Sequence, residues 1–175
     1  VLMYGGWDGI NHLNDAWIFE LSSTFLNIGN RNNGVTAEAA GAAAAAAVGK
    51  WTKSKDGPSL RGTHSMASSG NGRVLMYGGW DGINHLNDAW MFELSSTFLN
   101  IANENNGVAA EALVGNWART MDGPGVRGWH AMATLGNGRV LMYGGFLKTT
   151  TYKGYEEDLN DTWIFELSPF LNNND

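Results

Sequence analysis

Apolar residues follow two patterns in the middle of the chain, and both predict β-strands. Val74–Tyr77 is a continuous apolar run, which is typical of a strand that is buried on both faces. Farther along, Trp90, Phe92 and Leu94 alternate with other residues, so the strand period of two places them on one face. We therefore expect neighbouring strands at 74–79 and 88–94.

Turn residues and two weaker segments complete the predicted unit. Asn71-Gly72 is a strong hairpin signal, because both turn positions require positive φ, and it follows a run of small and apolar residues. A further short segment surrounds Trp117 and ends before the turn at 122–124. The sequence thus predicts four antiparallel strands, from the innermost to the outermost: 63–69, 74–79, 88–94 and 116–119.

This unit is repeated along the chain. Residues 1–28 and 74–101 are identical except at Ile18, where the second copy has Met91. A third copy begins at Val140 and resumes at Leu159 after a longer loop. Internal repeats of this kind indicate a repeat architecture, in which each unit buries its apolar faces against its neighbours.

The repeats predict an all-β fold. A four-stranded antiparallel sheet with two apolar faces must be covered on both sides, and similar sheets stacked radially achieve this in a β-propeller. Residues 1–175 are therefore expected to form a single propeller region with repeats starting near 1, 74 and 140. Inserts are expected between strands, at 22–49, 95–115 and 146–158.

Several residues of the repeat resemble the kelch family. The resemblance is carried by a double glycine, an Asn-Asp pair, two strand tryptophans, and an arginine with a nearby histidine. In the middle copy these are Gly78-Gly79, Asn87-Asp88, Trp90, Trp117, Arg127 and His130, with counterparts in the other copies. The resemblance implies kelch-type blades, although these repeats are longer than the usual fifty or so residues.

The three copies are not equally complete. The sequence starts at the second strand of one blade and ends after the third strand of another, so only the middle blade has all four strands. A propeller has typically four to eight blades. We therefore expect this chain to be part of a larger propeller or to assemble with copies of itself.

Composition excludes several classes of chemistry. The chain has no cysteine, so disulfides, thiolate metal ligands and thiol catalysis are excluded. Its net charge is −6 without any basic run, which argues against nucleic acid as a partner. No apolar run is long enough to suggest membrane insertion, and no cofactor or metal is expected. The sequence does not indicate a cellular compartment.

The face that carries the second-to-third strand loops is the predicted binding surface, because it combines aromatic and charged residues. A competing interpretation is that Asp8 and Asp81 simply make turns and that the tryptophans cover the blades. The candidate residues are Trp7, Asp8, His12, Trp80, Asp81, His85, Arg61, Arg127, Tyr152 and Tyr155.

Buried polar roles are the alternative for several of these residues. Arg61 and Arg127 are expected to pair with carboxylates or backbone carbonyls between blades. His64 and His130 are expected on the innermost strands as hydrogen-bonded structural residues. The apolar residues of the inserts are candidate assembly contacts: Phe25, Leu26, Phe98, Leu99 and Phe170.

The favoured function is a protein-binding or structural scaffold whose partner is another protein or another copy of the chain. One alternative is a kelch-like enzyme with its active site in further blades. Another is a glycan-binding propeller that uses the loop aromatics. No catalytic residue is nominated.

Overall fold

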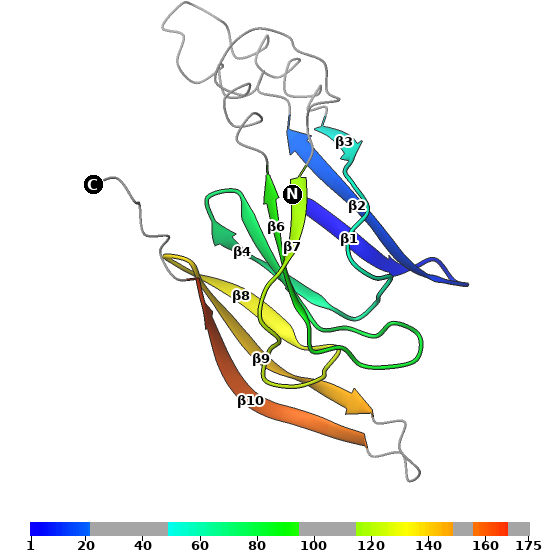
Figure 1. Cartoon of the computed structure of the whole chain (residues 1–175), viewed down its shortest axis with the longest axis vertical. Helices are drawn as coiled ribbons and strands as arrows, with labels where there is room; N and C mark the ends of the chain where they lie inside the picture. The colour runs from blue at the N-terminus through cyan, green and yellow to red at the C-terminus, as the bar shows by residue number, and fades with distance from the viewer. Residues whose placement is uncertain (22–48, 95–114, 149–155, 168–175) are drawn as a thin grey trace, which may run out of the picture.

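The computed structural model describes residues 1–21, 49–94, 115–148 and 156–167, and these form an all-β structure without a helix. They make three antiparallel sheets, which do not close into a barrel within the described part of the chain (Figure 1). The first sheet contains β1 (Leu2–Trp7), β2 (His12–Leu21) and β3 (Gly49–Lys53). The second contains β4 (Ser65–Gly70), β5 (Arg73–Tyr77), β6 (Ala89–Leu94) and β7 (Gly115–Arg119). The third contains β8 (Ala131–Gly136), β9 (Arg139–Lys148) and β10 (Glu156–Glu166).

Strands follow one another in space in the same order as in the sequence. The second sheet has the order β4-β5-β6-β7, the first β1-β2-β3, and the third β8-β9-β10. Every pair of neighbouring strands within a sheet is therefore consecutive in the sequence, including β2-β3 and β6-β7, which are separated by residues 22–48 and 95–114. The four strands predicted for the middle repeat are confirmed, with bounds that differ by at most two residues.

One predicted insert is shorter than expected. The segment 146–158 was expected to lie between strands, but Phe146 pairs with Asp158 and Lys148 with Glu156, so β9 and β10 extend into it. The register shifts between Leu159 and Thr162, which is the bulge that lets the extended pairing follow the double glycine. The expected loop begins with the apolar residues Phe146 and Leu147, and these residues instead continue strand β9.

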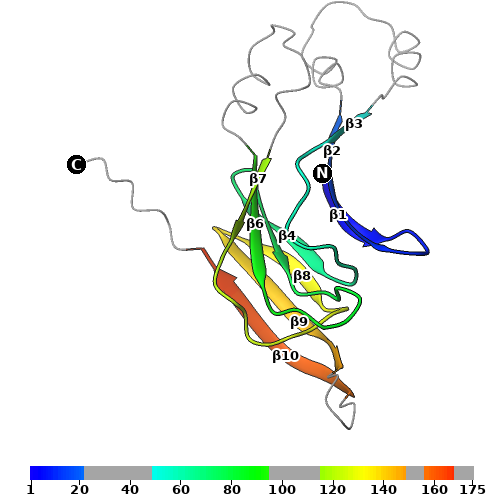
Figure 2. The ribbon, with the colours of Figure 1, turned by 45° about the vertical axis from the view of Figure 1, so that its right-hand side comes forward.

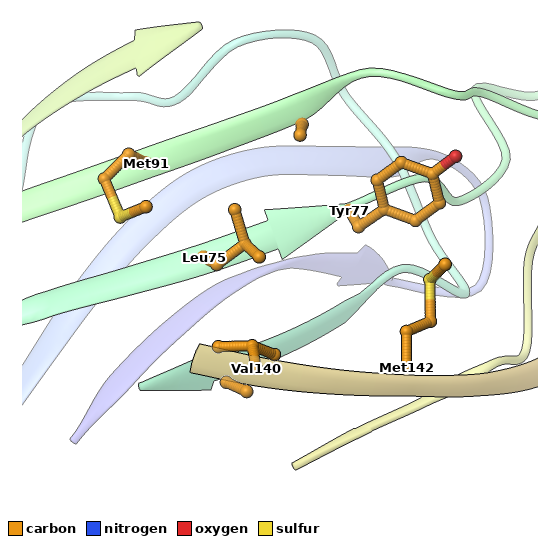
Figure 3. Close-up of a cluster of buried hydrophobic side chains, with 7 residues drawn as sticks. Leu75, Tyr77, Met91, Val140 and Met142 are labelled. Atoms are coloured by element: carbon orange, nitrogen blue, oxygen red, sulfur yellow. The ribbon is translucent and has the colours of Figure 1, made fainter. Parts of the chain in front are cut away.

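A hydrophobic core joins the second and third sheets. Leu75 and Tyr77 project from β5 towards Val140 and Met142 of β9, and Met91 of β6 completes the group (Figure 3). All five side chains are buried. The first strands of these two sheets, β4 and β8, lie side by side.

A second core joins the first and second sheets. Tyr4 and Ala16 of the first sheet are buried against Met76 of the second, and the half-buried Trp90 and Trp117 pack on this group. The ring centroids of Tyr4 and Trp117 are 4.9 Å apart. Both tryptophans are thus covered by the neighbouring sheet on one side and are only partly buried. Figure 2 shows the three sheets as successive layers.

We predict that equivalent leucines of two repeats differ in their contribution to stability. Leu75 is buried, whereas its repeat counterpart Leu141 is only partly buried. Leu75→Ala should therefore lower the free energy of unfolding by about 2–5 kcal/mol, and Leu141→Ala by clearly less. Urea unfolding of both variants measures this. Equal losses would contradict the assigned packing.

Candidate functional site

A buried arginine organises the junction between the first and second sheets. Arg61 lies just before β4 and its side chain is fully buried. Its Nη1 donates to Asp88 Oδ1 at 2.7 Å and its Nη2 to Asp88 Oδ2 at 2.9 Å. Nη1 also donates to the carbonyl of Gly78 at 3.0 Å. This bidentate geometry with an additional carbonyl matches the planar donor fork of a guanidinium.

The next repeat contains the same arrangement. Arg127 donates to Asp161 Oδ1 at 2.7 Å, to Asp161 Oδ2 at 2.9 Å, and to the carbonyl of Gly144 at 3.0 Å. The expected pairing of both arginines with carboxylates and backbone carbonyls is therefore present. Both guanidinium groups are buried and hydrogen-bonded. They therefore lie beneath the surface that carries the loops between the second and third strands, which we call the loop face.

Each arginine connects two sheets, because its backbone is bound by the preceding sheet. Arg127 N donates to the carbonyl of Leu86, and Gly79 N donates to the carbonyl of Arg127. Its side chain meanwhile binds the third sheet through Asp161. Arg61 is held in the same way between the first and second sheets. We call this unit, an arginine with its carboxylate and glycine carbonyl, the arginine clasp.

The double glycine makes this approach possible. Gly78 has φ +62° and Gly79 φ +104°, which are conformations that favour glycine. A Cβ on Gly78 would lie 2.5 Å from the carbonyl oxygen of Arg127. Any larger residue would therefore push the arginine backbone away from the sheet.

The first repeat contains the acceptor of a clasp without the arginine. Asp15 stands at the position of Asp88 and Asp161, and it accepts a hydrogen bond from Trp17 Nε1 at 2.6 Å, as Asp88 does from Trp90. Within the residues that the structure describes, no arginine is bonded to Asp15. Among the described residues, the first repeat therefore has the carboxylate of a clasp but not its arginine.

The clasp keeps its carboxylates ionised. Burial raises the pKa of Asp88, but hydrogen bonds from Arg61 and Trp90 and the charge of Arg61 outweigh burial and hold it below its ordinary value. The hydrogen bond from Arg127 is the main cause that lowers the pKa of Asp161 to about 2. Both ion pairs therefore persist well into the acidic range.

Two histidines lie beside the clasps at the start of the innermost strands. Burial, followed by the nearby charge of Arg61, lowers the pKa of His64 to about 4. Burial and Arg127 lower the pKa of His130 to about 4. The rings lie 5.4 Å from Tyr4 and Tyr77, respectively, in edge-on arrangements. Both histidines are therefore neutral packing residues at physiological pH.

The loop face begins with two equivalent turns. Asp8 Oδ1 accepts hydrogen bonds from the amides of Ile10 and Asn11, and Asp81 does the same in the second repeat. These amides lower the pKa of Asp8. The geometry of both aspartates therefore agrees with the competing interpretation, in which they form turns. Trp7 stays exposed beside the half-buried His12.

An aromatic cluster occupies the loop face between the second and third sheets. His85 lies 4.8 Å from Trp80, 5.8 Å from Trp129 and 5.9 Å from Phe146, measured between ring centroids. His85 is buried, and its Nδ1 accepts a hydrogen bond from the amide of Lys148 at 3.0 Å. Trp129, in contrast, is 63% exposed.

Sequence reasoning did not identify Trp129 and Phe146 as members of this surface. Trp129 stands where the preceding repeat has Thr63, so it is not part of the repeated signature. Its position between the signature residues Arg127 and His130 was the available signal. The remaining predicted residues lie outside the described residues: Tyr152, Tyr155, Phe25, Leu26, Phe98, Leu99 and Phe170.

The described residues contain no further candidate for a metal site or a membrane-spanning helix. No group of three or more histidine, aspartate or glutamate side chains in the described ranges is arranged to hold a metal ion. No described helix could cross a membrane. No protein-family model matches the chain, and no curated protein matches its sequence.

We predict a graded effect of aspartate-to-asparagine substitution across the three repeats. Asp88→Asn should destabilise the chain by about 3–5 kcal/mol, because it leaves a fully buried arginine without its counter-charge. Asp161→Asn should cost less, because the Asp161 side chain is 37% exposed. Asp15→Asn should cost below about 1 kcal/mol, because no described arginine binds it.

Chemical unfolding of the three variants provides the measurement. Every one of these aspartates precedes its tryptophan by two residues and accepts its indole hydrogen bond, so Asp15→Asn is a matched control for that bond. A cost at Asp15 equal to that at Asp88 would show that the arginine is not the source of the effect.

We also predict that acid destabilises the fold through the two histidines. The unfolded chain protonates His64 and His130 near pH 6.5, whereas the folded chain does so only near pH 4. Stability should therefore be fully present above pH 6.5 and fall as the pH decreases towards 4. The loss is about 2 kcal/mol per histidine between pH 6.5 and 5.

Unfolding experiments at pH 7 and pH 5 test this assignment. The double variant His64→Gln/His130→Gln should lose distinctly less stability over this interval than the unaltered chain. The clasp carboxylates titrate at lower pH and do not contribute to this window. An unchanged pH dependence in the double variant would refute the role of the histidines.

Proposed function

We propose that the chain is a segment of a kelch-type β-propeller and serves as a protein-binding or structural scaffold within a larger assembly. The observation that supports this proposal is made at both end sheets. Apolar positions that are buried in the middle sheet are exposed on the outward faces of the two end sheets.

The third sheet presents one such face. Tyr143 is 54% exposed, whereas its counterpart Tyr77 in the second sheet is 4% exposed. Ile164 is 58% exposed, whereas its counterpart Met91 is 7% exposed. Leu141 lies on the same face, since it alternates with the inward Val140 and Met142. These side chains form what we call the trailing face.

The first sheet presents the opposite face. Met3 is 46% exposed, while its counterpart Met76 is completely buried. Trp51 is 46% exposed and packs on Phe19 at 5.0 Å between ring centroids, as Trp117 packs on Phe92. We call this the leading face.

The trailing and leading faces are complementary, because they carry the residue types that pack against each other between the sheets of this chain. Within the chain, trailing-type residues of one sheet pack against leading-type residues of the next, as Tyr4 does against Met76 and Trp117. The trailing face therefore fits a leading face of another repeat or another copy. Such contacts between different surfaces generate rings or extended arrays, and exposed apolar patches of this kind favour association.

The loop face is a second candidate surface for partners. It has Trp7 exposed next to the turn residue Asp8 and Trp129 exposed beside His85, and exposed aromatics beside charges are frequent in protein interfaces. The aromatic rings of the cluster meet in tilted and edge-on arrangements, which supports a packed protein contact surface over an open platform for a sugar ring.

We predict that the chain self-associates at micromolar concentration through its end faces. Introducing charge by Tyr143→Glu or Ile164→Glu should shift the sedimentation coefficient towards that of a monomer, because a desolvated carboxylate opposes the apolar contact. The control is Ile83→Glu, since Ile83 is 68% exposed on the loop face and outside both end faces. A cooperatively folded monomer of the unaltered chain would overturn the proposal.

A further inference from the structure

An apolar cavity of about 420 Å³ lies between the second and third sheets. Leu75, Tyr77 and Ala89 of the second sheet form one wall. Met142 and Phe165 of the third sheet contribute to the other. The cavity extends to the outermost strand, β10, and is bounded on one side by the segment that follows β7.

The corresponding place between the first and second sheets is occupied by a tryptophan. There the wall residues are Tyr4 and Ala16, which are the repeat counterparts of Tyr77 and Ala89. Trp117 of β7 fills the space, with its ring 4.9 Å from Tyr4 and 5.1 Å from Phe92. The cavity thus has the lining of a tryptophan site whose tryptophan comes from a fourth strand.

The outer edge of β10 has the groups that such a strand needs. In the second sheet β6 pairs with β7 on this side, whereas in the described part of the third sheet β10 has no outer partner. Leu167 N donates to the carbonyl of Gly138, on the side of β9. Since backbone groups alternate along a strand, Ile164 and Glu166 direct their N–H and C=O groups to the free edge.

We propose that the edge of β10 and this cavity bind an extended peptide strand that carries a tryptophan two residues after a glycine. The pairing in the second sheet gives the register, because Trp117 stands opposite Phe92 and Gly115 opposite Leu94. The incoming tryptophan would stand opposite Phe165 and the glycine opposite Leu167. The mode of binding is strand addition, with the tryptophan in the cavity providing specificity.

The glycine requirement has a steric origin. A Cβ on Gly115 would lie 1.9 Å from the ring of Phe92, and a Cβ on Gly49 would lie equally close to the ring of Phe19. The ring of the facing phenylalanine thus covers the glycine in both sheets that have this strand. Phe165 is the equivalent residue of the third sheet.

Charge adds a further preference. Glu166 lies beside the free edge, whereas Asp122 is already paired with Arg119 at 2.6 Å, so a strand with a cationic residue opposite Glu166 is favoured over an acidic one. The sequence of β3 and the two residues after it, GKWTKSK at 49–55, satisfies all three requirements. It is therefore a suitable synthetic probe.

The experiment measures binding of a fluorescein-labelled peptide of residues 49–55 to the full chain by fluorescence anisotropy. The full chain is used as the Tyr143→Glu variant, because Tyr143 lies on the trailing face and outside the cavity lining. This choice separates the two proposals: the inference rests on the scaffold function, but the peptide does not use the stacking faces. Saturable binding with one peptide per chain is expected.

Matched peptides supply the controls without altering the protein. Trp51→Ala in the peptide should weaken binding at least about tenfold, because the cavity then stays unfilled. Gly49→Ala in the peptide should weaken it similarly through the clash with Phe165. Equal affinity of either control peptide with the original would overturn the proposal.

Hydrogen exchange locates the bound peptide. The amides of Ile164 and Glu166 should become protected when the peptide is bound, while those of the loop face should not change. Ile164→Pro removes one edge donor and should abolish binding with little change in the circular dichroism spectrum, since proline is tolerated at strand edges. Protection elsewhere, or unchanged binding by a folded Ile164→Pro variant, would refute this location.

Discussion

The arginine clasp is the constraint on which the arrangement of the sheets depends. A buried guanidinium must have its charge balanced and its donors bonded, and for Arg61 this is done by Asp88, the Gly78 carbonyl and Ser59. The arginine backbone is held by the first sheet at the same time. A cation fixed on both sides therefore sets how closely and at what angle successive sheets meet, which apolar packing alone would specify less sharply.

Repetition explains why nearly identical segments have different environments. Residues 1–7 and 74–80 have the same sequence, yet Met3 is exposed and Met76 is buried. The reason is that, among the described residues, only Met76 has a neighbouring sheet packed against it. The sequence of a repeat thus encodes an interface that needs a neighbour on each side. The two end faces and the clasp acceptor at Asp15 are consequences of this one property.

Much of the fold could be predicted from sequence, because residue patterns that would be weak evidence alone occur in more than one copy of the repeat. The double glycine, the aspartate before the strand tryptophan and the preceding arginine recur at fixed positions, and they indicated the strands and the kinds of group that both arginines bind. The extension of β9 to Lys148 was missed because the third loop has no second copy to compare. The cavity beneath β10 could not be predicted, since it depends on which sheets meet and not on any local pattern.

On the loop face, equivalent positions of the repeats carry different side chains. Thr63 and Trp129 occupy equivalent positions with φ near +55°, a conformation that both side chains disfavour. The surrounding clasp and glycines impose this backbone on whichever residue stands there, and Trp129 N donates to the carbonyl of Thr63 at 2.8 Å. A rigid backbone that accepts different side chains can change its surface without altering the fold. Trp129, which is exposed and in ring contact with His85 and Phe146, gives the second junction an aromatic surface residue where the first has Thr63.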